Sequence, residues 1–574
     1  MIVVRKEIYS AIKQVLVGLI SEKINFLVEK PENEGFGDYS SNVALVASKI
    51  LKKNPFELAQ KLTKEINSSP LILPNIDKVE VVKPGFINFW VSKEYLLSQL
   101  KQVLEQEEKF GSKNEDLSKK VVVEYSSPNI AKPFTVGHLR STIIGDAIAN
   151  LLQANGRKVY RDNHLGDWGT QFGKQIYAIK TWGDEEKIEK SENPVKELVA
   201  LYIKFHEEAE KNSELEEKAR VWFKRLEDGD SEARRLWKKC VDWSLAEFRK
   251  IYQDLGVEFT ENEGLGYGES FFEDKIQPVI EELRTKKLLK EGEGGARLVF
   301  FEKDKYPPLM ILKQDGATLY ATRDLATDKF RLEKYGKDVL IINEVGNEQS
   351  LYFRQLFETE KMLGWVKEGQ RIHIKHGLYR FKDAKMSTRK GNTIWLEEVL
   401  REAEKRALDL SSEKNVEIAR KVAIGAIKWN DLKRNSNSDI VFDWDEILNM
   451  QGDSGPYIQY GFVRTQSVLF KAKCPSLPGV FEDRKKLKFE PEEISLLRAI
   501  TRFPEVVLQA GENFAPNILC NYLFDLTQKF NLFYQKHKVI GSDQEDFRLV
   551  LTAGVGQVIK NGLNLLGISA PEKM

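Results

Sequence analysis

The stretch SSPNIAKPFTVGHLRS, residues 126–141, is the best guide to the fold of this 574-residue chain. It follows the β-branched run KKVVVEY and precedes TIIGDAIANLLQANG, whose apolar residues recur at helical spacing. The closing Asn155-Gly156 pair supplies a helix C-cap signal, and KVYRDNH (158–164) has the pattern of a second strand. The order strand, loop, helix, strand predicts a βαβ unit of a buried parallel sheet.

The loop before the predicted helix is suited to binding an anion. Unpaired backbone N–H groups and the positive end of the helix dipole point the same way there. Gly137 has no Cβ, so a planar base or a phosphate can approach the backbone, while Lys132 and His138 add donors. Taken alone, the TVGH fragment favours a plain βα turn with a capping histidine. The flanking Asn129 and Lys132 favour an anion site.

Composition and charge exclude several classes of protein. With 41% hydrophobic residues, 30% charged residues and a net charge of +1, the chain is expected to be globular and to lack a polyanion-binding tail. Charges interrupt the first apolar run, and no apolar stretch reaches about 18 residues, so we expect neither a signal peptide nor a membrane span. Cys240, Cys474 and Cys520 are far apart, which favours three buried thiols over a disulfide framework or a zinc cluster.

The pattern of hydrophobic residues changes along the chain. The first 115 residues combine a helical pattern with the hairpin-like VEVVKPGFINFWVS, residues 79–92. Strand signals follow from residue 119, interrupted by a highly charged helical stretch at about 183–250, and the chain is mostly helical from about residue 397. These patterns predict an α/β Rossmann-like parallel-sheet domain, a small α+β N-terminal domain and an all-α C-terminal helix bundle.

Four segments resemble a known family. SSPNIAK followed by Thr135-Val136-Gly137-His138 resembles the first signature of class I aminoacyl-tRNA synthetases, specifically of the arginyl-tRNA synthetase family. NHLGDWGTQFG (163–173) and the closing LLGISAPEKM (565–574) resemble the same family, and KMSTRKGN (385–392) resembles its mobile KMSKS loop. Because the four occur in the right order and spacing, the resemblance is strong and covers about residue 35 to Met574.

The resemblance implies a separate role for each of four regions of the chain. It assigns 1–115 to a tRNA-contacting α+β domain, 116–395 to the catalytic domain with its helical insertion at about 183–250, 396–452 to a helical stem-contact region and 453–574 to an anticodon-binding helix bundle. The implied enzyme activates L-arginine with ATP to arginyl-adenylate and pyrophosphate, then transfers arginine to the 3′-terminal adenosine of its tRNA. ATP with Mg²⁺ is expected, without an organic cofactor or structural zinc. Analogy suggests a cytoplasmic monomer.

The same resemblance implies which residues act on ATP. Lys132, His138, Lys385 and Lys390 would stabilise the reacting phosphates, and the further ATP contacts would be Thr135, Gly137, Met386 and Ser387. Two positions depart from the class pattern: Thr135 replaces a histidine, and Thr388 replaces a frequent lysine. Threonine keeps one hydroxyl donor but carries no charge, so we expect Lys132, His138 and the loop lysines to do more of the phosphate stabilisation. Without the resemblance, the basic loop would be interpreted as solvated.

Arginine selectivity requires groups that match a guanidinium. Its five donors form a planar fork that carboxylates match best. By resemblance, Glu269, Tyr320 and Asp324 would hold the guanidinium, and Tyr320 and Asp324 are four residues apart at a predicted helix start. Asn129 and Gln349, with Glu124 as a further candidate, would hold the α-amino and carboxylate end. Lysine would not fill a bidentate site, so large discrimination is expected without editing. Otherwise each acid would be interpreted as a surface carboxylate.

Aromatic side chains in the last 120 residues are candidates for reading RNA. Tyr457, Tyr460 and Arg464 fall on one helix face, and an unstacked anticodon loop is read by stacking on aromatics. By resemblance Tyr457, Tyr460, Tyr534 and Met574 lie near the anticodon. Most other aromatics at helical spacing are expected to form the core of the bundle.

Two alternatives stay open from the sequence. One is a class I synthetase for another amino acid, although a cysteine-specific enzyme would be expected to carry a zinc-ligand cluster and the acidic set points to a cationic substrate. The other is a non-catalytic paralogue that binds tRNA or arginine, an alternative that Thr135 keeps open and that Lys132, His138 and Lys385 oppose. ATP turnover would separate this alternative from a ligase.

Overall fold

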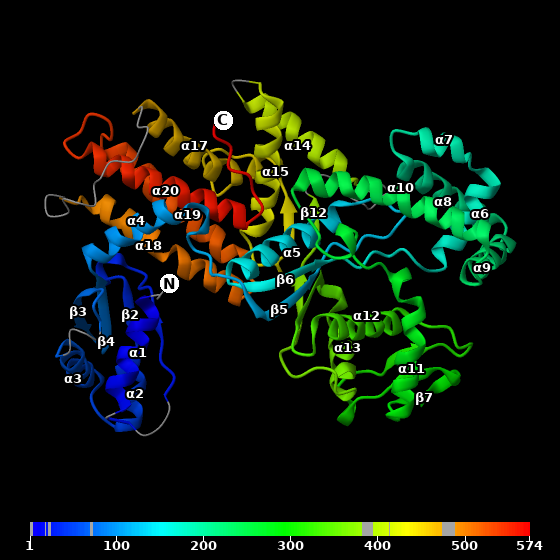
Figure 1. Ribbon diagram of the computed structural model, residues 1–574, viewed down its shortest axis with the longest axis horizontal. Coiled ribbons are helices and arrows are strands. Elements are labelled where there is room, and N and C mark those ends of the chain that lie inside the picture. Colours follow the sequence, from blue (N-terminus) through cyan, green and yellow to red (C-terminus); the bar gives the residue numbers. More distant parts are fainter. Residues whose placement is uncertain are drawn as a thin grey trace. The chain divides into compact units, whose positions relative to one another are not determined.

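The computed structural model describes residues 4–17, 19–20, 24–68, 73–381, 394–411, 414–472 and 488–574. The chain divides into two compact units, each assembled from separate segments (Figure 1). One unit contains residues 1–113, 461–509 and 522–562, and the other contains residues 114–460, 510–521 and 563–574.

The second unit is built on a four-stranded parallel sheet. Its strand order is β11-β10-β5-β6. The strands are β5 (Asp116–Glu124), β6 (Arg157–Asp162), β10 (Leu340–Gly346) and β11 (Arg371–His376). Val121, Val122 and Val123 of β5 are fully buried, as predicted for a central parallel strand. The predicted βαβ unit is confirmed, because α5 (Val136–Ala154) connects β5 to its parallel neighbour β6.

Three further groups of elements belong to the unit that contains this sheet. Helices α6 to α10 form one cluster within the unit (Figure 1). They are α6 (Gln171–Trp182), α7 (Glu185–Lys190), α8 (Pro194–Lys211), α9 (Glu214–Glu227) and α10 (Ser231–Leu255). Helices α7 to α10 correspond to the helical stretch expected at about 183–250, and α6, with Phe172, Ile176 and Ile179 buried, precedes it; the bounds of the insertion stay a prediction.

A small antiparallel sheet lies between the helical cluster and β10 in the sequence. It contains β7 (Leu289–Glu291), β8 (Arg297–Val299) and β9 (Leu309–Leu312) in that order. Its apolar residues share a buried core with α11 (Ile276–Thr285), α12 (Tyr320–Tyr335) and α13 (Ser350–Met362). The strand signals between the helical cluster and residue 397 therefore fall in separate sheets, because β7, β8 and β9 form this sheet whereas β10 and β11 belong to the parallel sheet.

The segment after the parallel sheet packs back on α5. It contains β12 (Tyr379–Phe381), α14 (Leu396–Leu410), α15 (Val416–Leu432), β13 (Ile440–Phe442) and α16 (Trp444–Ile447), and β12 pairs with β13 in parallel. Arg140 on α5 and Asp431 on α15 form a fully buried ion pair, with Nη2 3.1 Å from Oδ1. Because removing either partner would leave a buried charge, this pair fixes the approach of α15 to α5.

The first unit joins the N-terminal α+β part to C-terminal helices. Its antiparallel sheet has the order β1-β2-β4-β3. The elements are α1 (Val4–Val17), β1 (Val28–Glu29), β2 (Tyr39–Ser41), α2 (Val43–Leu51), α3 (Pro55–Asn67), β3 (Ile76–Val82), β4 (Phe86–Val91) and α4 (Lys93–Gln106), with most of α17 (Gly455–Lys471), α18 (Pro491–Glu512), α19 (Pro516–Lys536) and α20 (Glu545–Leu565). The β3–β4 hairpin confirms the prediction around Pro84-Gly85.

Ion pairs tie the two parts of this unit together. Arg498 Nε lies 2.9 Å from Asp38 Oδ1, and the Tyr39 hydroxyl donates to Glu505 Oε2 over 2.9 Å. From the sequence, the N-terminal α+β part and the C-terminal helices are predicted to be separate domains. The predicted domain boundaries at residues 115 and 453 stay predictions. None of the helices in the described ranges combines the length and apolar character needed to cross a bilayer.

Candidate active site

The first candidate group is the N-terminal end of α5. Thr135 is the N-cap residue in an extended conformation, and its backbone N–H donates to Nδ1 of His138 over 3.0 Å. Because Nδ1 accepts this hydrogen bond, the imidazole carries its proton on Nε2. Burial, reinforced by His376 and Lys132, lowers the pKa of His138 to about 4. The histidine therefore caps the helix as a neutral ring and offers one N–H donor.

The surroundings of this helix end are open on one side. Gly137 is exposed, and a Cβ built there would meet only Thr135 Oγ1, at 3.4 Å. Lys132 is half-buried, with Nζ 6.0 Å from the centre of the Tyr202 ring, and burial lowers its pKa. A small neutral donor, a cation and an unobstructed glycine thus surround one helix N-terminus, an arrangement suited to phosphate and a planar base.

A second group, which we call the acidic pocket, comprises His164, Glu269, Tyr320, Asp324 and Tyr352. Asp324 Oδ1 lies 3.6 Å from His164 Nε2, and the Tyr352 hydroxyl donates to the other carboxylate oxygen. Tyr320 packs edge-on against Tyr352 with ring centres 4.8 Å apart. Burial raises the pKa of Asp324 to about 6 and also raises that of Glu269.

His164 is held between carboxylates. Its Nδ1 lies 3.1 Å from the carbonyl oxygen of Tyr267, so the proton on Nδ1 is donated there and Nε2 faces Asp324. Burial disfavours the imidazolium, but Glu124, Asp324 and Glu269 outweigh burial and raise the pKa of His164. A pocket that favours an imidazolium is electrostatically suited to an organic cation with several N–H donors.

Glu124 and Asp162, at the carboxyl ends of β5 and β6, belong to a buried ion network. Arg331 on α12 lies 2.5 Å from Glu124 and 2.7 Å from Asp162, and 3.3 Å from Asp328 one turn away. Asp328 continues the network to Arg371 on β11 at 2.6 Å. The sequence suggested that Glu124 contacts an α-amino group. The structure gives it Arg331 as a partner, and the contact to substrate stays a prediction.

Asn129 and Gln349 follow neighbouring strands of the sheet. Asn129 forms a bridge to Gly166, where an added Cβ would lie 2.1 Å from Asn129 Oδ1. Only glycine at 166 leaves room for this amide. Gln349 is exposed and ends the 3₁₀ turn Asn347–Gln349 directly after β10. Because the carboxyl ends of parallel strands define the ligand crevice of open α/β sheets, both amides occur where a substrate is expected.

Other predicted residues lie elsewhere. Lys385, Met386, Ser387 and Lys390 are outside the described residues. Tyr460 and Tyr534 are 39% and 42% exposed, with the guanidinium carbon of Arg464 5.3 Å from the centre of the Tyr534 ring, whereas Tyr457 and Met574 are half-buried. Phe530 and Phe533 on α19 are fully buried, as expected for core aromatics. Cys240 and Cys520 are buried free thiols, as predicted, and Cys474 is outside the described residues.

Sequence reasoning did not name several residues of this region, His164, Tyr352 and Arg331 among them, although a signal existed for His164. His164 lies inside the quoted stretch NHLGDWGTQFG, whereas Tyr352 and Arg331 occur in ordinary amphipathic helices. Among the described residues, no group of three or more His, Cys, Asp or Glu side chains is placed to hold a metal ion.

Comparisons with known proteins agree with this geometry. The family model described as "tRNA synthetases class I (R), catalytic domain" matches residues 99–444, "DALR anticodon binding domain" matches 458–574, and "Arginyl tRNA synthetase N terminal domain" matches 3–91. The first model covers more than half of the chain. The Rossmann-like sheet and these matches define a class I aminoacyl-tRNA synthetase.

Full-length relatives narrow the assignment. The chain is 42% identical to an arginine–tRNA ligase of Clostridium perfringens over 97% of this chain and 98% of that protein. It is 41% identical to one of Fusobacterium nucleatum over 94% of each. An arginyl-tRNA synthetase structure from Plasmodium falciparum superposes with a TM-score of 0.83 at 26% identity, covering both chains completely. The chain belongs to the arginyl-tRNA synthetase family.

Proposed function

We propose that this ATP-dependent arginine–tRNA ligase holds the guanidinium of its amino acid in the acidic pocket. The observation that carries the proposal is the 3.6 Å contact of Asp324 with His164, whose pKa both Asp324 and Glu269 raise, because two carboxylates in a half-buried site disfavour neutral side chains and favour a cation. Tyr320, one turn before Asp324 on α12, would add a hydroxyl or a ring face. A planar guanidinium can satisfy several of these acceptors at once, and lysine cannot.

Asn129 and Gln349 would bind the α-amino and carboxylate groups of arginine. Both occur after the carboxyl ends of parallel strands, one after β5 and one after β10. Glu124 lies at the same end of β5, where its pairing with Arg331 keeps it ionised and its pKa lowered despite burial. It could therefore attract the ammonium group as a fixed negative charge.

The first chemical step would take place at the N-terminal end of α5. The arginine carboxylate attacks the α-phosphate of ATP, and the bond to pyrophosphate breaks. His138 would donate its Nε2 proton as a hydrogen bond to a phosphate oxygen without transferring it, because the ring has a pKa of about 4 and remains neutral at working pH. Lys132 would supply positive charge, and Gly137 would allow the adenine or ribose close approach.

The loop carrying Lys385, Met386, Ser387 and Lys390 would complete this ATP site. Mg²⁺ would accompany the nucleotide: Lys132, His138 and Thr135 at the helix end include no carboxylate, so they suit the phosphates and not the ion. We expect neither an organic cofactor nor structural zinc. No covalent nucleophile on the enzyme is needed, since binding geometry and electrostatics suffice for this type of transfer.

In the second step the adenylate would acylate the 3′-terminal adenosine of tRNA. We assign tRNA contacts to 1–115, stem contacts to 396–452 and anticodon recognition to 453–574, with catalysis in 116–395. Tyr457, Tyr460, Tyr534 and Met574 are the candidate anticodon residues, and the exposure of Tyr460 and Tyr534 supports their role. We further propose that the enzyme works as a cytoplasmic monomer.

Arginine-dependent pyrophosphate exchange tests the activity, with and without tRNA and with lysine as the control amino acid. We expect pyrophosphate exchange with arginine and none with lysine. Binding of tRNA without exchange or aminoacylation with either amino acid would instead identify a binding paralogue.

The pocket assignment has its own test. Asp324→Asn should raise the arginine KM about 10²–10³-fold with a much smaller effect on the ATP KM, because it removes one partner of a desolvated charge pair. Asp304→Asn removes an exposed carboxylate and is the matched control. Equal arginine KM values for the two variants would reject the pocket.

A further inference from the structure

A second cavity, separate from the acidic pocket, lies at the open edge of β11. Its volume is about 460 Å³, within the range of about 300–1,000 Å³ found for ligand sites. Its walls come from β11, residues 431–437 at and after the end of α15, and the turn 513–517, with Ile144 and Asn347. All lining residues belong to the unit that contains the parallel sheet. In the part of the chain that the structure describes, β11 is the edge strand of the parallel sheet, with β10 as its neighbour.

The polar lining consists mainly of carboxamides. Five asparagines contribute: Asn347, Asn435, Asn437, Asn513 and Asn517. A carboxamide carries a donor and an acceptor side by side, the pattern that pairs with the edges of nucleobases. In this cavity Asn347 Oδ1 already accepts from the Ser350 hydroxyl and Asn435 Oδ1 from the backbone N–H of Asn437, and each oxygen keeps a second lone pair. The lining acid Asp431 is engaged by the buried Arg140, so it does not make the cavity a cation site. Ile144 and Leu432 give the cavity an apolar surface beside these amides.

The basic side chains of the cavity differ in whether they already have a partner. Arg434 donates to Asn430 and pairs with Glu446, and burial lowers the pKa of His373, which leaves that ring neutral. Lys375 is half-buried on β11, and among the described residues no carboxylate lies within 4.0 Å of its ammonium. A half-buried ammonium without a carboxylate attracts an external anion.

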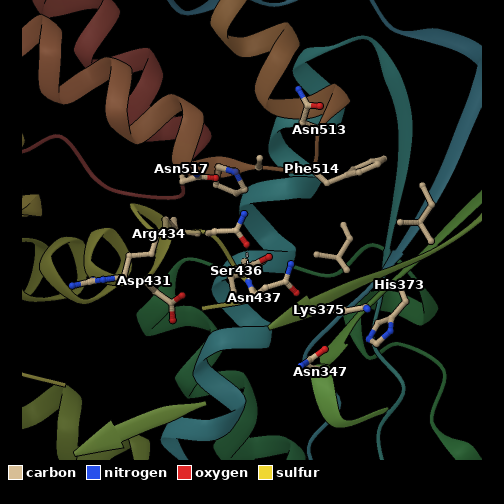
Figure 2. Close-up of a pocket in the computed structure, with 17 residues that line it drawn as sticks. Asn347, His373, Lys375, Asp431, Arg434, Ser436, Asn437, Asn513, Phe514 and Asn517 are labelled. Atoms are coloured by element: carbon tan, nitrogen blue, oxygen red, sulfur yellow. Dashed lines mark hydrogen bonds between the residues drawn. The ribbon is translucent and has the colours of Figure 1, made fainter. Parts of the chain in front are cut away.

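An aromatic ring completes the cavity wall. Phe514 lies in the turn between α18 and α19 with φ of +51°, a left-handed conformation that a bulky residue rarely adopts. Figure 2 shows Asn513, Phe514 and Asn517 on one side of the cavity and Asn347, His373 and Lys375 on the other. Strained residues of this kind cluster at ligand-binding segments, and a ring opposite a cation and amides is suited to base stacking.

We propose that this cavity binds one unstacked nucleotide of the tRNA substrate, with the base against Phe514 and the asparagine amides and a phosphate at Lys375. That the nucleotide belongs to tRNA rests on the proposed function of the chain as a tRNA ligase. It also accords with the net charge of +1, because a chain without overall positive charge must hold a polyanion through local contacts. A free nucleotide presents the same chemistry, and the experiment separates the two sources.

Direct binding of a tRNA transcript at several salt concentrations tests the proposal on the full chain. Lys375→Met should raise the Kd about 3- to 10-fold and reduce the slope of log Kd against log salt by about 1. Phe514→Gly keeps the left-handed turn and should raise the Kd about 5- to 100-fold through lost stacking. Lys367→Met, which removes an exposed lysine that pairs with exposed Asp338, is the matched control.

The outcomes are distinguishable. Retained KM values for arginine and ATP in both variants would show that they fold and that the cavity acts on tRNA alone. Kd values and salt slopes equal to the control, in variants that still charge tRNA, would overturn the proposal while leaving the ligase function intact. Calorimetry with AMP provides the second arm: AMP binding that Lys375→Met abolishes, with unchanged tRNA binding, would assign the cavity to a free nucleotide and overturn the tRNA source.

Discussion

Replacing Arg331 with methionine should destabilise the catalytic unit in a pH-dependent manner. The guanidinium contacts Glu124, Asp162 and Asp328, all of them buried. Losing one positive charge leaves one carboxylate without compensation, and at pH 7 the protein can escape this only by taking up a proton. For a carboxyl with an ordinary pKa of 4.5, that uptake costs 2.5 pH units, or about 3.4 kcal/mol.

This value agrees with the about 3–5 kcal/mol observed when one partner of a buried pair is removed. Because protonation becomes easier in acid, the cost should shrink to below about 1 kcal/mol at pH 5. Urea unfolding at pH 7 and pH 5 measures both values. Arg220→Met is the control, since Arg220 is 70% exposed and pairs with Glu217 on the surface, so its loss should cost under about 1 kcal/mol at either pH. A cost for Arg331→Met that is equally large at both pH values would show that lost packing, and not charge, dominates.

The remaining predictions concern substrate binding. Because Asp324 has a pKa of about 6, the arginine KM should fall as pH rises from 5 to 7, which steady-state kinetics across that range would check; a flat profile would contradict its role. Gly166→Ala would push a Cβ into the Asn129 amide and should raise the arginine KM about 10-fold or more; an unchanged KM would remove Asn129 from the substrate site. Thr135→His should change kcat or the ATP KM by an order of magnitude or more, and identical constants would show that position 135 does not contact phosphate. His138→Asn should lower kcat about 10²-fold or more in pyrophosphate exchange, with the pH profile between 5 and 8 unchanged because the wild-type ring does not titrate there.

The sequence alone predicted the elements whose signals are local. The β-branched run before residue 126, the helical spacing after Gly137 and the Asn155-Gly156 cap are set by neighbouring residues, and β5, α5 and β6 follow them closely. Tyr320 and Asp324 occur on one helix as predicted, because a spacing of four residues fixes that relation.

The contacts that the side chains of the site make depend on the tertiary structure. The sequence cannot show that His138 turns Nδ1 to the Thr135 backbone, because the ring's orientation and burial depend on packing around α5. Arg331 pairs with Asp162 across 169 positions of the chain, and only the parallel sheet brings them together. Charge compensation in a buried site is a property of all the groups that surround it. Local patterns therefore located the site, and the fold determined its protonation and its partners.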